Sequence, residues 1–211
     1  MARRVAQRDE WETSVVESIA GNWEECELRR NRSEVWSYAQ KKWDESIAAY
    51  RAVLSRVPVI TSINLQIASA YRQKKDYDGA LAAYNDILKA EPANEEAKIE
   101  MAMTSVERGD VKAAREVLTK AAADTSASRD IFYSLGEVTL AAHDVDEATR
   151  WFEKAASADP YWAKPLLRLG EAAMQKGDGA SAARLLARAV EVDPTAPEAA
   201  TAKAALESLK K

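Results

Sequence analysis

Residues 129–162 read RDIFYSLGEVTLAAHDVDEATRWFEKAASADPYW, and the fold can be predicted from the residue pattern in this stretch. Its first half has the i, i+3, i+4, i+7 spacing of one helical stripe, formed by Phe132, Leu135, Gly136 and Thr139. A second stripe follows a short polar break and consists of Ala148, Phe152 and Ala155. Asp144 is a natural N-cap for the second helix, and Glu147 three residues later completes a predicted capping box. Because proline cannot continue a helix, Asp159-Pro160 marks its end, and the stretch predicts a helix hairpin.

The same pattern recurs at a spacing of 34 residues. An aspartate column consists of Asp76, Asp110, Asp144 and Asp178. An alanine column consists of Ala80, Ala114, Ala148 and Ala182, and a column of large residues consists of Tyr84, Leu118, Phe152 and Leu186. A column of small residues in the first helix consists of Ala68, Ala102, Gly136 and Gly170. These columns define four blocks without insertion or deletion, at 61–94, 95–128, 129–162 and 163–196. One hairpin cannot bury its own apolar face, so neighbouring blocks must stack.

These columns resemble the tetratricopeptide repeat family. The family pattern has a small residue and an aromatic in each helix and then a proline, which Ala68, Tyr71, Ala80, Tyr84 and Pro92 reproduce. The resemblance implies an all-α, right-handed α-solenoid of tetratricopeptide helix hairpins with helical caps. Such proteins are interaction scaffolds, so it also implies a protein partner.

We expect the chain to consist of four parts, of which the repeats at 61–196 are one. Residues 1–26 form an N-terminal amphipathic helical segment rich in tryptophan, and residues 27–60 form a degenerate repeat. Residues 61–196 form the four tetratricopeptide repeats. Residues 197–211 form a C-terminal capping helix that shields the last repeat.

Composition excludes several classes of function. The 211 residues include 34 acids, 30 bases, one histidine (His143) and one cysteine (Cys26). Neither a disulfide framework nor a Cys/His zinc site can be built from these, and no phosphate-binding loop or activated nucleophile is visible. We therefore expect no enzyme and no cofactor. Without a basic block we expect no nucleic-acid partner, and the charges that interrupt every apolar run argue against membrane insertion.

By family resemblance, the first helix of each hairpin lines a concave groove. The residues expected to bind a peptide there are Leu65, Arg72, Ile99, Met103, Val106, Tyr133, Glu137, Leu140, Leu167, Arg168 and Met174. The apolar members form a strip outside the packing columns within each repeat, and methionine suits an adaptable groove. The alternative is that these side chains meet the second helices of neighbouring blocks as ordinary packing.

The charges around this strip predict the character of the ligand. The acids are Glu96, Glu100, Glu107, Asp130, Glu137 and Glu171, and the bases are Arg72, Lys164 and Arg168. We therefore expect a ligand with an apolar face and basic flanks, such as an amphipathic helix. A clamp for a C-terminal carboxylate, known in chaperone-binding relatives, is rejected, because Ser134, Ile99 and Met103 stand where asparagine and lysine would be needed.

Two loop features have competing interpretations. His143 occupies a column that elsewhere holds Gly109, Gly177 or Lys75, so it is interpreted as a solvated loop residue. Tyr161-Trp162 is interpreted as a hydrophobic staple onto the following helix, with an exposed recognition patch as the alternative.

The sequence as a whole predicts a non-enzymatic scaffold or adaptor that binds a peptide or amphipathic helix. The alternative is a self-assembling, homo-oligomeric repeat protein that uses the N-terminal tryptophan-rich segment. We expect a cytoplasmic protein, or a periplasmic one if a leader has been removed. The alanine-rich repeats punctuated by Asp-Pro resemble bacterial members of the family.

Overall fold

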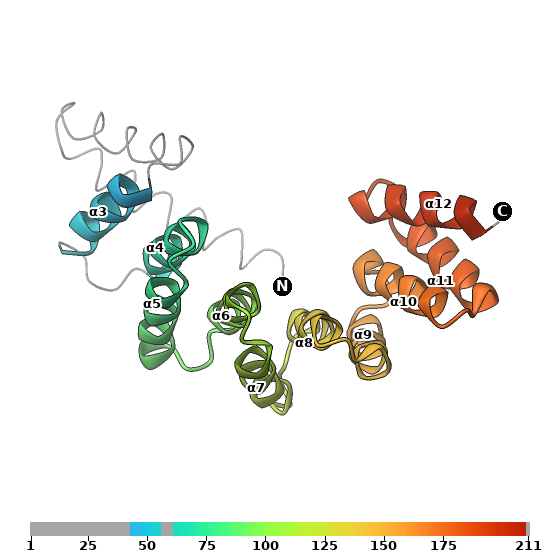
Figure 1. The fold of residues 1–211 in the computed structure, drawn as a ribbon, viewed down its shortest axis with the longest axis horizontal. Coiled ribbons are helices and arrows are strands. Elements are labelled where there is room, and N and C mark those ends of the chain that lie inside the picture. Colours follow the sequence, from blue (N-terminus) through green and yellow to red (C-terminus); the bar gives the residue numbers. More distant parts are fainter. Residues whose placement is uncertain (1–42, 56–60, 210–211) are drawn as a thin grey trace. The chain divides into compact units, whose positions relative to one another are not determined.

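The computed structural model describes residues 43–55 and 61–209, and in these ranges the protein consists of ten α-helices and no strands (Figure 1). In chain order they are α3 (Trp43–Leu54), α4 (Thr61–Gln73), α5 (Tyr77–Ala90), α6 (Glu95–Arg108), α7 (Val111–Ala122), α8 (Arg129–Ala141), α9 (Val145–Ala158), α10 (Ala163–Gln175), α11 (Gly179–Val192) and α12 (Pro197–Leu209). The predicted N-terminal segment 1–26, with Cys26, and the first half of the degenerate repeat lie outside the described residues. The chain forms two compact units, 1–83 and 84–211, which divide within α5.

The described part of the first unit is held together by α3 and α4. Its core consists of Ile47, Ile67 and Ala70, with Trp43, Tyr50, Leu54, Ile63 and Tyr71 packed against it. Two polar contacts join the same helices at the surface. Arg51 Nη2 donates to the Tyr71 hydroxyl over 2.7 Å, and Lys74 Nζ lies 2.6 Å from Asp44 Oδ1. Helix α3 therefore packs on α4 through an apolar stripe, as a second helix packs on the first helix of the next repeat.

The second unit stacks three complete hairpins, α6–α7, α8–α9 and α10–α11, and ends with α12 (Figure 1). Within each hairpin the two helices pack on each other, and each second helix also packs on the first helix of the next pair. This arrangement confirms the predicted α-solenoid of helix hairpins. Helix α12 packs on α11 and α10 and buries Ala199 and Ala202 against them.

Complementary side-chain volumes hold the two helices of a hairpin together. The buried residues of α9 are Ala148, Phe152 and Ala155, which is the predicted stripe. A Cβ atom added at Gly136 of α8 would lie only 2.5 Å from Phe152 Cε1, and one at Gly170 of α10 would lie 2.7 Å from Leu186 Cδ2. The small residues in one column of the first helix therefore leave room for the large residues in a column of the second helix.

The turn inside each hairpin uses the same two devices. The residue before the aspartate has a left-handed backbone, with φ of +65° at Lys75, +92° at Gly109, +62° at His143 and +77° at Gly177. The aspartate that follows caps the second helix; Asp110, for example, accepts a hydrogen bond from the Ala113 N–H over 3.0 Å. His143 is exposed, as expected, and the glycines in its column are explained by the positive φ, which glycine adopts without steric cost.

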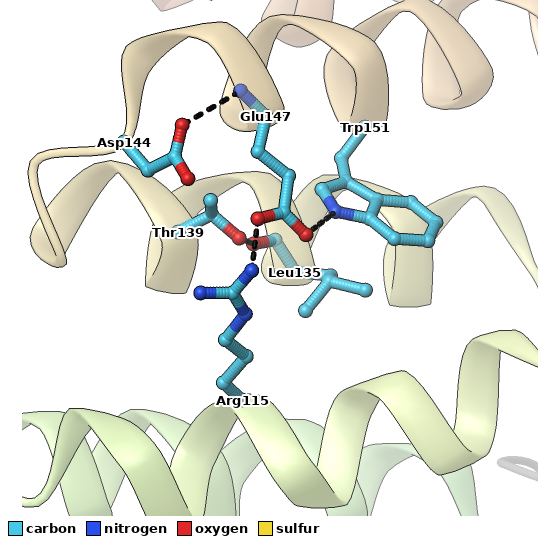
Figure 2. Close-up of polar contacts among 6 residues, drawn as sticks. All are labelled: Arg115, Leu135, Thr139, Asp144, Glu147 and Trp151. Carbon is cyan, nitrogen blue, oxygen red and sulfur yellow. Dashed lines mark hydrogen bonds and ion pairs between the residues drawn. The ribbon is translucent and has the colours of Figure 1, made fainter.

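The capping box predicted at α9 is only half present (Figure 2). Asp144 Oδ1 accepts from the Glu147 N–H over 3.0 Å, as predicted. The reciprocal bond is missing, because the Asp144 N–H donates instead to the Thr139 carbonyl over 3.2 Å. The Glu147 carboxylate accepts from Arg115 of the preceding repeat and from Trp151 Nε1, the latter over 3.2 Å. Only the half of the prediction that concerns the Glu147 side chain was wrong, because a neighbouring repeat supplies a charged partner for its carboxylate.

Candidate functional site

The predicted peptide-binding residues lie on four first helices. Leu65 and Arg72 belong to the first unit, on α4, where both are half-buried. The others belong to the second unit, with Ile99, Met103 and Val106 on α6, Tyr133, Glu137 and Leu140 on α8, and Leu167, Arg168 and Met174 on α10. We call these nine positions, together with the charged residues Glu96, Asp130, Lys164 and Glu171 on the same helices, the inner face.

The apolar part of the inner face also serves the core. Ile99, Met103 and Val106 are half-buried and pack against a cluster that includes Ile131, Leu135 and Val138 of α8. Tyr133 and Leu140 pack against Phe152 and Leu169, whereas Leu167 is only 8% exposed within the cluster around Leu186. Although this strip lies outside the packing columns within each repeat, it therefore forms part of the core between repeats. Its residues join neighbouring repeats, and the ligand-accessible surface is formed by their remaining exposed edges and by the charges beside them. Peptide binding by these residues stays a prediction.

A hollow of about 280 Å³ opens on the inner face where α8, α10 and α12 meet. It is lined by Tyr133, Lys164, Leu167, Arg168, Glu171, Pro197, Glu198 and Thr201. The first five of these are inner-face residues, so the structure brings predicted positions from α8 and α10 together. Tyr133 and Leu167 supply apolar surface, and the other side chains are mostly charged or polar.

Arg168 is the centre of a charged network beside the hollow. Its Nη2 donates to Glu137 Oε2 over 2.9 Å, and its Nη1 donates to Glu171 Oε2 over 2.9 Å. Its Nε lies 2.8 Å from Glu137 Oε1, close enough for an ion pair although that oxygen has no aligned hydrogen bond. Burial disfavours the charged guanidinium, but Glu171, Tyr133 and Glu137 outweigh this effect and raise the pKa of Arg168. Two carboxylates from successive repeats therefore hold one arginine.

Tyr133 connects the hollow to an aromatic cluster. Its ring centroid lies 5.5 Å from that of Phe152 and 5.0 Å from that of Trp162, and the Arg129 guanidinium lies 4.6 Å from the Trp162 ring. Burial, reinforced by the negative charge of Glu137, raises the pKa of Tyr133, so its hydroxyl stays protonated at neutral pH. The Tyr133 ring thus packs between Phe152 and Trp162 at the wall of the hollow.

The Tyr161-Trp162 pair does not form the predicted staple. Tyr161 is 81% exposed, and Trp162 packs back onto Tyr133 of α8, in the same 34-residue block. Trp162 occupies the N-cap position of α10 but makes no side-chain capping bond there. Of the pair, only Tyr161 has the exposure that the alternative interpretation required, and a role in recognition stays a prediction.

The residues that α12 contributes to the hollow were not predicted from the sequence. Pro197, Glu198 and Thr201 lie 34 residues after Ala163, Lys164 and Leu167. Extending the repeat period one further block would therefore have identified them. They were missed because this helix was interpreted only as a cap that shields the last repeat.

Comparisons with known proteins agree with this geometry. A tetratricopeptide repeat family model matches residues 71–132 and 139–206, and a second model of that description matches residues 38–95. The chain belongs to the tetratricopeptide repeat family. Members of this family are generally non-enzymatic interaction scaffolds, and the repeat fold suggests protein–protein interaction and protein partners.

Solved structures of other tetratricopeptide repeat proteins share the fold. TTC0263 from Thermus thermophilus is 17% identical with a TM-score of 0.63, and the match covers 87% of this chain and 98% of that one. MamA from Desulfovibrio magneticus is 18% identical with a TM-score of 0.61, over 81% of this chain and 96% of that one. Yeast Tom70 is 15% identical with a TM-score of 0.70, over 86% of this chain and 39% of the longer Tom70 chain. At these identities the likeness establishes the fold alone.

No curated protein sequence matches the chain. Across residues 43–55 and 61–209, no helix has the length and apolar character needed to span a bilayer. In the same ranges, no three histidine, cysteine, aspartate or glutamate side chains gather into a group that could hold a metal ion.

Proposed function

We propose that this tetratricopeptide repeat protein is a non-enzymatic scaffold or adaptor that binds a peptide or amphipathic helix of a partner protein along its inner face. The observation that carries the proposal is the hollow between α8, α10 and α12. Proteins bind ligands in concave surfaces where a few convergent polar groups fix the ligand's orientation, and this hollow presents charged side chains beside Tyr133 and Leu167.

The charge of the inner face supports a ligand with basic flanks. Glu96 and Asp130 are exposed on α6 and α8, and Glu137 and Glu171 together outnumber the single arginine that they hold. The only bases among the inner-face residues of the second unit are Lys164 and Arg168. Such a face attracts cations over several ångströms and repels acidic segments.

A pair of double variants with equal change in charge tests the proposal. Glu96→Lys with Asp130→Lys reverses two exposed charges on the inner face, whereas Glu116→Lys with Glu153→Lys reverses two exposed charges on the second helices α7 and α9. The probe is a fluorescent helical peptide with a leucine face and lysine flanks, and binding is measured by anisotropy. We expect saturable binding to the wild type, about five- to tenfold weaker in the inner double variant. The outer double variant should bind within about twofold of the wild type.

Two results would contradict the proposal. One is the absence of saturable binding to the wild-type protein. The other is an equal loss of affinity in both double variants, which would mean that the peptide responds to net charge and not to the inner face. Circular dichroism melts of each variant establish that the fold is retained.

A further inference from the structure

One cation that lines the hollow between α8, α10 and α12, Arg168, is already paired with carboxylates of the protein. All three nitrogens of the Arg168 guanidinium face carboxylates, with Glu137 on one side and Glu171 on the other. The arginine side chain is 34% exposed, so water does not replace these partners freely. A ligand carboxylate would have to displace one of them, and it would meet the other at short range. Arg168 is therefore unsuited to receive an anion.

One carboxylate that lines the hollow is not paired with a base among the described residues. Glu198, the second residue of α12, lines the hollow and makes no ion pair with any residue that the structure describes. Lys164 is the other charged lining residue without an ion pair in the described ranges, and it is exposed at the start of α10. Its four-carbon stem lets the ammonium group move out into solvent, whereas Glu198 is half-buried.

The balance of formal charge around the hollow is negative. The lining itself has two acids, Glu171 and Glu198, and two bases, Lys164 and Arg168. Glu137 lies outside the lining but pairs with Arg168, and counting it leaves one uncompensated negative charge. The Tyr133 hydroxyl stays neutral and adds no charge, and Leu167 provides the apolar surface. A long side chain with an apolar stem and a terminal cation complements this lining, since its stem can contact Tyr133 and its charge can reach Glu198 and Glu171.

We infer that the hollow receives a lysine or arginine side chain of the bound peptide, with Glu198 as the receiving carboxylate. The inference rests on the proposed function and adds to it a specific subsite and a specific ligand group. In this arrangement Glu137 and Glu171 act as positioning residues. By neutralising Arg168 they keep the hollow selective for cations over anions.

Three peptide probes and four variants test this subsite. The peptides share one leucine face and carry lysine, glutamine or glutamate flanks. The variant Glu198→Gln removes the receiving charge, and Glu191→Gln removes an equal charge from an exposed position on the second helix α11 as the matched control. Lys164→Gln removes the mobile cation. Glu137→Gln with Glu171→Gln releases Arg168 from both carboxylates.

The expected results differ for each protein. The wild type should prefer the lysine-flanked peptide to the glutamine-flanked one, and the glutamate-flanked one should bind least. Glu198→Gln should weaken binding of the lysine-flanked peptide about two- to fivefold and leave the glutamine-flanked peptide unchanged, whereas Glu191→Gln should change neither. Lys164→Gln should strengthen binding of the lysine-flanked peptide about twofold. The Glu137→Gln, Glu171→Gln double variant should reverse the preference toward the glutamate-flanked peptide.

The outcomes separate the subsite from the proposed function. If the wild type binds the lysine-flanked peptide but Glu198→Gln behaves like Glu191→Gln, the subsite is overturned while inner-face binding stands. A wild type that prefers the glutamate-flanked peptide also overturns the subsite. If none of the three peptides binds, the proposed function fails and the subsite fails with it.

Discussion

In the hairpins α8–α9 and α10–α11, the first helix buries more residues than the second. In α9 and α11 three residues are buried, at i, i+4 and i+7, which are Ala148, Phe152 and Ala155 in one helix and Ala182, Leu186 and Ala189 in the other. In contrast, α8 buries six residues and α10 buries seven. In these two hairpins the second helix thus contributes one buried stripe to the stack, whereas the first helix is enclosed from two sides.

This difference explains why the candidate site lies on the first helices. Because α8 and α10 each contact their own partner helix and the neighbouring repeats, their remaining surface is narrow and its side chains are held in place. Arg168 and Tyr133 on this surface have fixed partners. Residues such as Glu116 and Glu153, on the second helices, are exposed and are not enclosed by neighbouring side chains in this way. Preorganised side chains lose less conformational entropy when they bind a ligand.

The largest expected effect comes from breaking the close contact between α8 and α9. Gly136→Ala places a methyl group against the fully buried Phe152 ring, and overpacking of this kind costs about 1–3 kcal/mol. Alanine recovers about 1 kcal/mol through its higher helix propensity, so we expect a net loss of up to about 2 kcal/mol in urea unfolding. Adding Phe152→Leu recreates the Ala102 and Leu118 pair of the preceding repeat and should recover part of that loss.

A matched glycine on a second helix gives the control. A Cβ atom at Gly179, the first residue of α11, would meet no atom within 4 Å. Gly179→Ala should therefore raise the free energy of unfolding slightly or leave it unchanged. Equal destabilisation by Gly136→Ala and Gly179→Ala would contradict the account of complementary volumes.

A smaller effect is expected in the loop that joins the two helices. His143 has φ of +62°, a conformation that costs a residue with a side chain about 1 kcal/mol. His143→Gly should therefore raise the free energy of unfolding by about 0.5–1 kcal/mol. Ala142→Gly, one position earlier at φ of −80°, should lower it, because no such strain exists there. Stabilisation by both variants, measured in the same urea titration, would contradict this explanation.

Much of the fold follows from residue columns that a single repeat determines. The aspartate column predicts the N-caps, and the glycine and alanine columns predict where two helices approach closely. Burial of Ala148, Phe152 and Ala155 follows from their spacing alone. These features depend on contacts within one hairpin, so the local pattern contains the necessary information.

The features that sequence reasoning missed depend on contacts between repeats. Glu147 leaves its predicted capping bond for Arg115, which lies 32 residues earlier. Trp162, at the N-cap of α10, packs back on Tyr133 of α8. The packing of Ile99 against α8 belongs to the same class. A pattern that repeats in every block does not reveal these partners, because the residues concerned differ from block to block.

We propose that the partner peptide lies on the first helices of the hairpins and not on the second helices. The most direct measurement places a photo-crosslinking benzophenone side chain at Asp130 on α8 in one protein and at Glu153 on α9 in another, both exposed positions. Each protein is irradiated with the lysine-flanked peptide, and adducts are identified by mass spectrometry. We predict an adduct at position 130, suppressed by unlabelled peptide, and none at position 153. A competable adduct at position 153 with none at position 130 would contradict the account.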